Sequence, residues 1–265
     1  MSPHVTRTGQ GPRIVLLHGW ALNSHVWDDI APRLSEQFTV ECVDLPGHGL
    51  SPWIPFHDLA SLAAALQPVL DDECVLVGWS LGSLAALELS LSAPHRVKAL
   101  IAVAGTPKFL NSDDWHEGVD ANVLDSFAER LTQDFAGTVR DFLALQVQGS
   151  DRARETLRAL RRKVLDHGAP AMPALVAGLE VLRKADLRES LARIRVPTLV
   201  IAGERDRLTP PGGSRELAQR LTGARFHLVD GAAHAPFLSH PEEFLREIVQ
   251  FLARRPRTGR KAGAA

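Results

Sequence analysis

The stretch Cys74-Val75-Leu76-Val77-Gly78-Trp79-Ser80-Leu81-Gly82 decides the fold of this chain. Four residues typical of a buried strand lead into a G-x-S-x-G sequence, and a helix-like run over 83–89 follows. This arrangement is typical of a nucleophile elbow, a sharp turn that pushes a serine hydroxyl out of the sheet. Gly78 and Gly82 leave room for that turn. We therefore predict that Ser80 is a nucleophile, against the alternative of an ordinary serine in a glycine-rich turn.

Composition limits the classes of protein to which the chain can belong. Its 265 residues are 45% hydrophobic, enough to fill a large core in a single large domain. A balance of 30 basic and 31 acidic residues leaves a formal net charge of −1, without the overall signature of a nucleic-acid-binding protein. The N-terminus lacks a signal peptide's apolar segment, and no run approaches the ~20 apolar residues of a membrane span. We predict a cytoplasmic monomer without nucleic-acid or membrane partners.

Short strand-like runs alternate with amphipathic helical stretches along the chain. The strand-like runs are 14–17, 39–43, 74–77, 99–103, 198–202 and 225–229. The helical stretches are 26–34, 59–70, 84–91, 214–221 and 241–252. Such alternation predicts an α/β fold with a mostly parallel sheet and helices on both faces. Ligands of these sheets bind beyond the carboxyl ends of the strands, where Ser80 falls.

One interval breaks the alternation. Between about residues 108 and 194 the chain shows only helical patterns, at 123–135, 139–146, 153–165 and 171–182. We expect residues 108–194 to form an all-helical lid, inserted between two strands of a core made of residues 1–107 and 195–253. A separate helical domain without a part in catalysis is the alternative. The basic tail, 254–265, cannot bury a core, and we expect disorder there.

Loops after the last two predicted strands supply the partners that a serine nucleophile needs. Asp206 and His234 complete the chain order Ser, Asp, His of this kind of site. We predict that His234 Nε2 takes the Ser80 proton, while Asp206 holds the Nδ1 proton and stabilises the imidazolium. Glu204 and Asp230 lie near the ends of the same strands. A helix cap or a surface carboxylate is therefore the alternative role for Asp206.

An oxyanion intermediate needs two hydrogen-bond donors. The backbone N–H of Leu81, directly after the nucleophile, is one candidate. The loop after the strand-like run 14–17 reads His18-Gly19-Trp20, where Gly19 lets the backbone turn inward and the Trp20 N–H point at the site. The Trp20 indole is also expected to line the pocket, with plain core packing as the alternative.

These motifs identify a known family. From about Gly11 to Leu252 the chain resembles α/β-hydrolases of the BioH type, the pimeloyl-[acyl-carrier protein] methyl ester carboxylesterases of biotin biosynthesis. Motifs shared with many hydrolases are His18-Gly19, Asp44-Leu45-Pro46-Gly47-His48-Gly49, Gly78 to Gly82, Asp206 and His234. More particular segments are Leu16 to Trp20 with Leu22-Asn23, Phe142 to Gln146, and Ala232 to Phe237 with Ser239-His240-Pro241. The resemblance implies the α/β-hydrolase fold and hydrolysis of a carrier-bound pimeloyl methyl ester to methanol.

The resemblance also implies site residues, and it implies no metal or redox cofactor. The acyl site would be lined by Trp20, Ser80, Leu81, Phe142, Leu143, Ala144, Leu145, Gln146 and His234. For the segment 142–146 a packing face of a lid helix is the alternative. The two cysteines, Cys42 and Cys74, lie in strand-like segments and are expected to pack in the core rather than to form a disulfide or a metal site.

An acidic carrier protein calls for a basic docking surface. Arg154, Arg158, Arg161 and Arg162 follow the spacing i, i+4, i+7 and i+8, which places them on one face of a helix. Taken alone, this pattern is typical of a solvated helix face. The resemblance makes these arginines candidate carrier contacts. At Gly137 and Asp141 the chain departs from the arginines that the family carries there.

Two other functions remain open from the sequence. A general carboxylesterase or a carbon–carbon bond hydrolase would use the same three catalytic residues with a different pocket. A non-catalytic ligand receptor on the same scaffold is the other alternative, and an intact set of catalytic residues argues against it.

Overall fold

The computed structural model describes residues 1–165 and 167–253. A seven-stranded sheet in the order β1-β3-β2-β4-β5-β6-β7 forms its centre. The strands are β1 Val5–Thr8, β2 Arg13–Leu17, β3 Thr39–Val43, β4 Cys74–Trp79, β5 Val97–Val103, β6 Thr198–Gly203 and β7 Arg225–Val229. Every neighbouring pair is parallel except β1 and β3, which are antiparallel. The predicted mostly parallel sheet is confirmed.

The sequence pattern missed β1 and shortened β4. Three of the four residues of β1 are exposed, so the strand carries no apolar signal, and pairing with β3 is what holds it at the edge. The apolar run of β4 ends at Val77, but Gly78 and Trp79 still pair with Ala102 and Val103 of β5. The sheet therefore continues up to the residue before Ser80.

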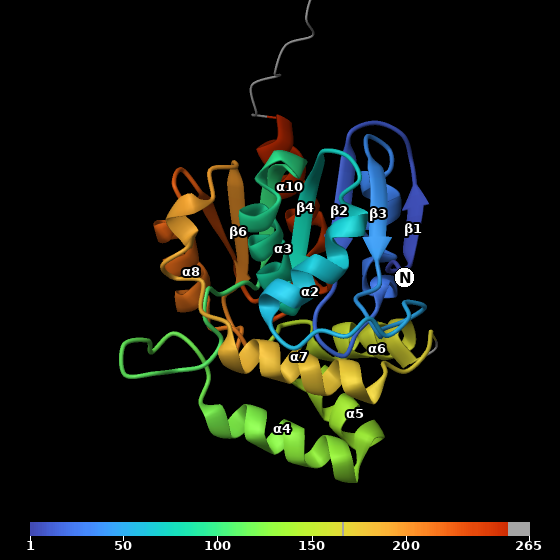
Figure 1. Ribbon diagram of the computed structural model, residues 1–265, viewed down its shortest axis with the longest axis vertical. Coiled ribbons are helices and arrows are strands. Elements are labelled where there is room, and N and C mark those ends of the chain that lie inside the picture. The colour runs from blue at the N-terminus through green and yellow to red at the C-terminus, as the bar shows by residue number, and fades with distance from the viewer. Residues whose placement is uncertain (166, 254–265) are drawn as a thin grey trace, which may run out of the picture.

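Helices cover both faces of the sheet, with α2 and α3 on one face and α10 on the other (Figure 1). Outside the inserted segment the helices are α1 Ala31–Leu34, α2 Leu59–Leu66, α3 Leu81–Ser92, α8 Pro211–Arg220, α9 Pro236–Ser239 and α10 Pro241–Ala253. The 3-10 turns are η1 Ser24–Trp27, η2 Gln67–Val69, η3 Pro94–Arg96 and η4 Leu191–Arg193. This layered arrangement agrees with the prediction from the alternating pattern.

Two predicted helices are interrupted. The stretch 26–34 is divided into η1 and α1, and Pro32 lies in the first turn of α1, where its missing N–H is not needed. The stretch 59–70 is helical only to Leu66, because Pro68 has no N–H to donate to Ala64. Both helices were predicted from the spacing of apolar residues, which does not take account of the prolines.

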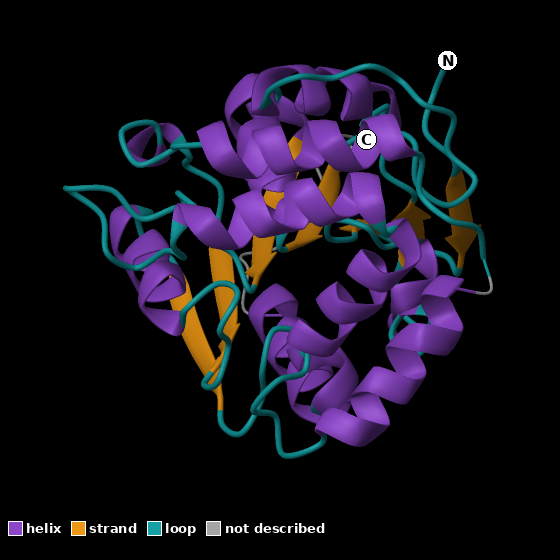
Figure 2. Cartoon of the chain, turned by 90° about the horizontal axis from the view of Figure 1, so that it is seen from below, coloured by secondary structure: helices purple, strands orange, loops and turns teal. Residues whose placement is uncertain are grey.

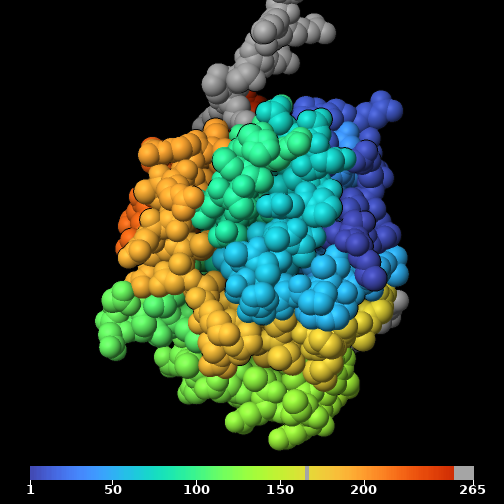
Figure 3. Space-filling model, viewed as in Figure 1, coloured from blue at the N-terminus to red at the C-terminus, as the bar shows by residue number. Residues whose placement is uncertain are grey.

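Four α-helices of the described chain lie between β5 and β6 and pack beyond the carboxyl ends of the parallel strands (Figure 1). They are α4 Ala121–Gln133, α5 Phe135–Leu145, α6 Ala153–Leu165 and α7 Met172–Lys184. Seen from below, they stack against the end of the sheet (Figure 2). In the space-filling view this green-to-yellow segment forms the lower part of the molecule (Figure 3). Helices are inserted between two strands as predicted, but residues 108–120 form loops and isolated bridges instead of a helix. The boundaries at 108 and 194 and the action as a lid stay predictions. The tail, 254–265, lies outside the described residues.

Both cysteines are free and buried, as expected for packing residues. Burial raises the pKa of the Cys42 thiol and of the Cys74 thiol to about 12. At neutral pH both thiols are therefore in the protonated form, which is a poor nucleophile.

Candidate active site

Ser80 occupies the sharp turn between β4 and α3. Its backbone has φ 57° and ψ −117°, in the left-handed half of backbone space that residues other than glycine rarely adopt. A Cβ on Gly78 would meet the Gly82 carbonyl oxygen at 2.2 Å, and one on Gly82 would meet the Leu17 carbonyl oxygen at 2.5 Å. Both glycines are required because backbone packs directly on backbone there. The elbow geometry expected from the motif is present.

Asp206 and His234 form a buried pair. His234 Nδ1 lies 2.7 Å from Asp206 Oδ2, and both side chains are almost fully buried. The His234 Nε2 atom is also buried and has no hydrogen-bond partner among the described residues, so the predicted hydrogen bond from Ser80 is not formed here. Such bonds are often long before substrate binds. The geometry leaves Nε2 unengaged, as a base needs, and the assignment of the three catalytic roles stays a prediction.

The loop that carries His234 is held on two sides. The backbone N–H of His234 donates to the Gln146 carbonyl at 3.0 Å, and the His234 carbonyl accepts the indole N–H of Trp79 at 2.7 Å. The Trp79 and His234 rings lie 5.6 Å apart. Because Trp79 directly precedes Ser80, this indole places the histidine loop beside the elbow.

A hydrogen bond to the His18 ring sets the orientation of the Gly19-Trp20 peptide. His18 Nε2 accepts the Leu45 N–H at 2.9 Å, so the imidazole proton is on Nδ1, which donates to the Gly19 carbonyl at 2.8 Å. Since C=O and N–H of a trans peptide point in opposite directions, this bond turns the Trp20 N–H away from His18. That N–H donates to no described residue.

Two further features fit an oxyanion site at this point. A Cβ on Gly19 would lie 3.3 Å from Ser80 Cβ, so the loop runs against the nucleophile. Leu81 begins α3, and a first-turn N–H has no acceptor inside its helix. The role of the Trp20 and Leu81 N–H groups as oxyanion donors stays a prediction.

His18, Asp44 and His48 form a buried polar cluster next to this loop. Burial lowers the pKa of His18, and burial together with neighbouring His18 lowers the pKa of His48 to about 3. Burial opposes ionisation of Asp44, but His18 and the N–H groups of Leu50 and Ser24 bring its pKa below the ordinary value. Both shifts favour the neutral imidazole, and a neutral His18 leaves Nε2 able to accept the Leu45 N–H.

The Trp20 indole is buried in an aromatic wall that it forms with Phe142 and Phe127, and its expected place in a substrate pocket stays a prediction. Its ring lies 4.7 Å from Phe142 of α5 and 6.2 Å from Phe127 of α4, and its N–H donates to the Leu175 carbonyl of α7 at 2.9 Å. Glycine is required at Gly178, because a Cβ there would meet the indole at 2.5 Å. Phe127 was not among the predicted site residues, because its position in a helical pattern indicated packing only.

The five residues 142–146 are divided among different surroundings. Phe142 faces Trp20, whereas Leu143 is fully buried in the core. Gln146 is buried beside the histidine loop, and neither polar atom of its side chain has a partner among the described residues. Ala144 and Leu145 instead line a groove of about 610 Å³ between α4, α5 and α6. The end of α5 thus contacts Trp20 and the histidine loop as well as this groove.

Arg154 also lines that groove, next to Arg130 and Asp141, which pair with each other. The α6 arginines at 154, 158, 161 and 162 are all exposed, and none forms an ion pair with another described residue. The basic face predicted from spacing is therefore exposed, and the acidic residues that the structure describes do not neutralise it.

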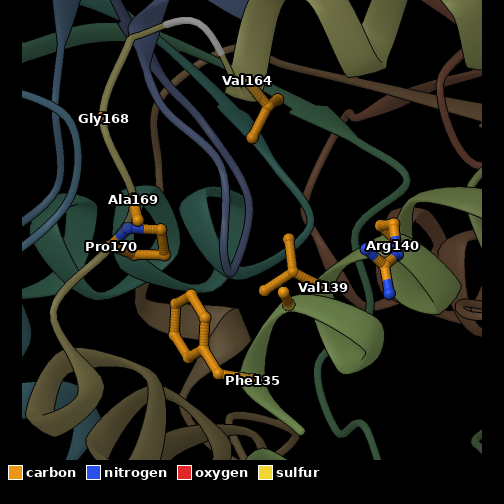
Figure 4. Close-up of a pocket in the computed structure, with 8 residues that line it drawn as sticks. Phe135, Val139, Arg140, Val164, Gly168, Ala169 and Pro170 are labelled. Atoms are coloured by element: carbon orange, nitrogen blue, oxygen red, sulfur yellow. The ribbon is translucent and has the colours of Figure 1, made fainter.

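A smaller cavity of about 200 Å³ lies between α5, the end of α6 and the loop before α7 (Figure 4). Its lining residues are Phe135, Ala136, Val139, Arg140, Val164, Gly168, Ala169 and Pro170. None of the predicted site residues lines it.

Within the described ranges, no group of three or more His, Cys, Asp or Glu side chains could hold a metal ion. No described helix is long and apolar enough to span a membrane.

Comparison with known proteins agrees with this geometry. The alpha/beta hydrolase fold family matches residues 12–241. The pimeloyl-[acyl-carrier protein] methyl ester esterase of Aeromonas hydrophila is 42% identical over 254 residues, covering 95% of this chain and 100% of that protein. The enzyme of the same name from Nitrosomonas europaea is 42% identical, covering 92% and 97%. An esterase structure from Exiguobacterium antarcticum has the same fold, with a TM-score of 0.86 at 24% identity over 95% of each chain. By its sheet, its elbow and its relatives, this chain belongs to the alpha/beta hydrolase fold family.

Proposed function

We propose that this protein is a serine esterase that hydrolyses the methyl ester of a pimeloyl chain carried on acyl carrier protein. The observation that carries the substrate assignment is 42% identity, over 95% of the chain, to an enzyme of that name. The chemistry is supported by the buried Asp206–His234 pair beside the strained Ser80 elbow. The three side chains come from the ends of separate strands, as catalytic groups of parallel sheets do.

The reaction follows from the roles proposed for these groups. Ser80 Oγ attacks the ester carbonyl while His234 Nε2 takes its proton, and Asp206 stabilises the imidazolium. The N–H groups of Trp20 and Leu81 bind the oxyanion. The imidazolium then gives its proton to the leaving methoxide, which departs as methanol. Water, deprotonated by His234, hydrolyses the acyl-enzyme and frees Ser80.

The exposed arginines of α6 support docking of an acidic carrier. Arg154, Arg158, Arg161 and Arg162 present four charges that described acidic residues do not neutralise. Arg154 borders the groove that Ala144 and Leu145 line, so the basic face lies next to part of the predicted acyl site. Long-range attraction of this kind mainly speeds association and fixes orientation.

The test measures methanol release from pimeloyl carrier-protein methyl ester and from a free short methyl ester. We expect Ser80→Ala to abolish both activities. The double variant Arg154→Glu/Arg158→Glu should raise KM for the carrier-bound ester about tenfold and leave the free ester unchanged. Charge reversal at Arg193 and Arg195 is the matched control, because both are exposed and lie just before β6, near the amino end of that strand.

Each possible result bears on the proposal. Equal turnover of both esters by the wild type, with no effect of the α6 double variant, would identify a general carboxylesterase instead. Hydrolysis that survives Ser80→Ala would remove the proposed chemistry altogether. A stronger effect of the control pair than of the α6 pair would place the docking surface elsewhere.

A further inference from the structure

Thr209 touches three parts of the candidate site at once. It lies in the loop between Asp206 and α8 and is only 2% exposed. Its Oγ1 atom lies 2.8 Å from Asp206 Oδ2, 3.0 Å from the Ala104 carbonyl oxygen and 3.2 Å from His234 Nδ1. One hydroxyl thus joins the acid, the base and the end of β5.

Thr209 supplies half of the donors that surround the Asp206 carboxylate. Oδ1 accepts the N–H groups of Leu208 at 2.9 Å and of Thr209 at 3.0 Å. Oδ2 accepts His234 Nδ1–H and the Thr209 hydroxyl. An ionised carboxylate has about four acceptor sites, and all of them are used here. Because the Asp206 side chain has 0% exposure, water cannot replace a donor that is removed.

The hydroxyl also faces the histidine. Its single proton has two acceptors, and the charged carboxylate attracts it more strongly than the neutral Ala104 carbonyl. A lone pair of Oγ1 is then left toward His234 Nδ1–H at 3.2 Å. When His234 takes a proton from the nucleophile, Nδ1–H becomes more positive, and the interaction with this lone pair strengthens.

Ala104, which follows the last residue of β5 and contacts the Thr209 hydroxyl, is itself held in place by the sheet. Ala104 has φ 45°, one of only three non-glycine residues with positive φ in the described chain, together with Ala21 and Ser80. Its N–H donates to the Ile201 carbonyl of β6 at 2.8 Å, so the sheet itself holds the strained residue. A strained backbone conformation persists only where the surrounding structure holds it in place. Ser80 and Ala104 directly follow the ends of β4 and β5, and Ala21 directly follows the oxyanion loop, residues 18–20.

We propose that Thr209 is a positioning residue: its hydroxyl holds the Asp206 carboxylate and His234 Nδ1–H in the geometry that stabilises the imidazolium. The inference rests on the proposed catalytic roles of Ser80, Asp206 and His234, but not on the identity of the ester. Thr209 does not touch the substrate and acts only through the acid and the base. Any residue at 209 supplies the backbone N–H, so the inference concerns the hydroxyl alone.

The test compares Thr209→Val, which keeps the shape and removes the hydroxyl, with Thr209→Ser, which keeps the hydroxyl. With 4-nitrophenyl acetate as substrate, Thr209→Val should lower kcat about tenfold, with KM within about twofold, because both acylation and deacylation use His234. Tenfold is about 1.4 kcal/mol, close to the value of a hydrogen bond to a charged group. Thr209→Ser should restore most of kcat. Labelling of Ser80 by a fluorophosphonate should follow the same order.

Thr222→Val, which removes an exposed threonine hydroxyl in the loop before β7, is the matched control and should match the wild type. Thr209→Ala serves as a second hydroxyl-free variant, and far-UV circular dichroism checks the fold of each protein. Unchanged kcat in a folded hydroxyl-free variant overturns the inference, and so does a serine variant as slow as valine. Loss of the fold in both hydroxyl-free variants would show a structural role instead. If Ser80→Ala is still active, the proposed chemistry itself is wrong.

Discussion

The two oxygens of the Asp206 carboxylate have different kinds of partner. Oδ1 accepts two backbone N–H groups, from Leu208 and Thr209, which can only donate. Oδ2 faces His234 Nδ1 and the Thr209 hydroxyl. The loop therefore fixes which oxygen meets the histidine, and with it the imidazole tautomer that leaves Nε2 able to accept a proton.

This asymmetry predicts the effect of Asp206→Asn. The two backbone N–H groups require an oxygen at the Oδ1 position, so the new amide nitrogen takes the place of Oδ2 and donates to His234 Nδ1. The imidazole proton must then move to Nε2, which no longer accepts from Ser80. We expect kcat to fall by about 10⁴, with the melting temperature close to that of the wild type. Imidazole nitrogen NMR reports the tautomer, and a variant within tenfold of wild-type kcat contradicts the assignment.

At the scale of elements, the site depends on the close approach of α3 to the end of β2. A Cβ on Gly82 would lie 2.5 Å from the carbonyl oxygens of both Leu17 and His18. These oxygens belong to the strand end and to the loop that orients the Trp20 N–H. The first turn of α3 and the oxyanion loop are therefore in contact through backbone atoms that side-chain rotation cannot relieve.

We expect Gly82→Ala to destabilise the fold by about 3 kcal/mol or more, at the upper end of overpacking effects. The displaced loop should also reduce fluorophosphonate labelling of Ser80 at least a hundredfold. Gly223→Ala is the comparison, because no atom lies within 4 Å of its Cβ position and only its φ of +71° opposes alanine. That variant should lose about 1 kcal/mol and keep full labelling. Urea unfolding and labelling rates measure both effects, and equal losses in the two variants would contradict the packing argument.

At the scale of the whole molecule, burial of neutral histidines links stability to pH. Burial, aided by His18, lowers the pKa of His48 to about 3. In the unfolded chain the same imidazole has a pKa of about 6.5. Between these values the unfolded chain binds a proton that the native protein does not. Stability therefore falls as pH decreases through this window, and is highest above about pH 6.5.

His48→Gln removes this proton linkage. Well below pH 6.5 the wild type should lose about 1.4 kcal/mol more per pH unit than the variant. Urea unfolding at pH 4.5, 5.5, 6.5 and 7.5 gives the two slopes. A variant that is less stable at every pH has a lower free energy of unfolding but the same slope against pH. The comparison of slopes therefore remains valid if the substitution destabilises the protein in general. Parallel slopes would show that His48 is protonated in the native state or accessible to solvent.

Local pattern was sufficient for much of this protein. The apolar run before Gly78 and the G-x-S-x-G sequence indicated the strand, the elbow and the nucleophile, because strand, turn and helix signals lie within a few neighbouring residues. The strand-like runs placed Asp206 and His234 in loops at one edge of the sheet, since parallel strands bring their carboxyl ends together. The relatives then agreed with the family suggested by these motifs.

Tertiary structure alone decided the rest. β1 has no apolar pattern and exists because it pairs with β3. The division of residues 142–146 between the aromatic wall, the core and the groove depends on which helices pack around α5. The Thr209 hydroxyl meets residues 105 and 25 positions away, at Ala104 and His234. Periodicity records which face of an element is buried, but it carries no information about which distant side chain completes a hydrogen bond there.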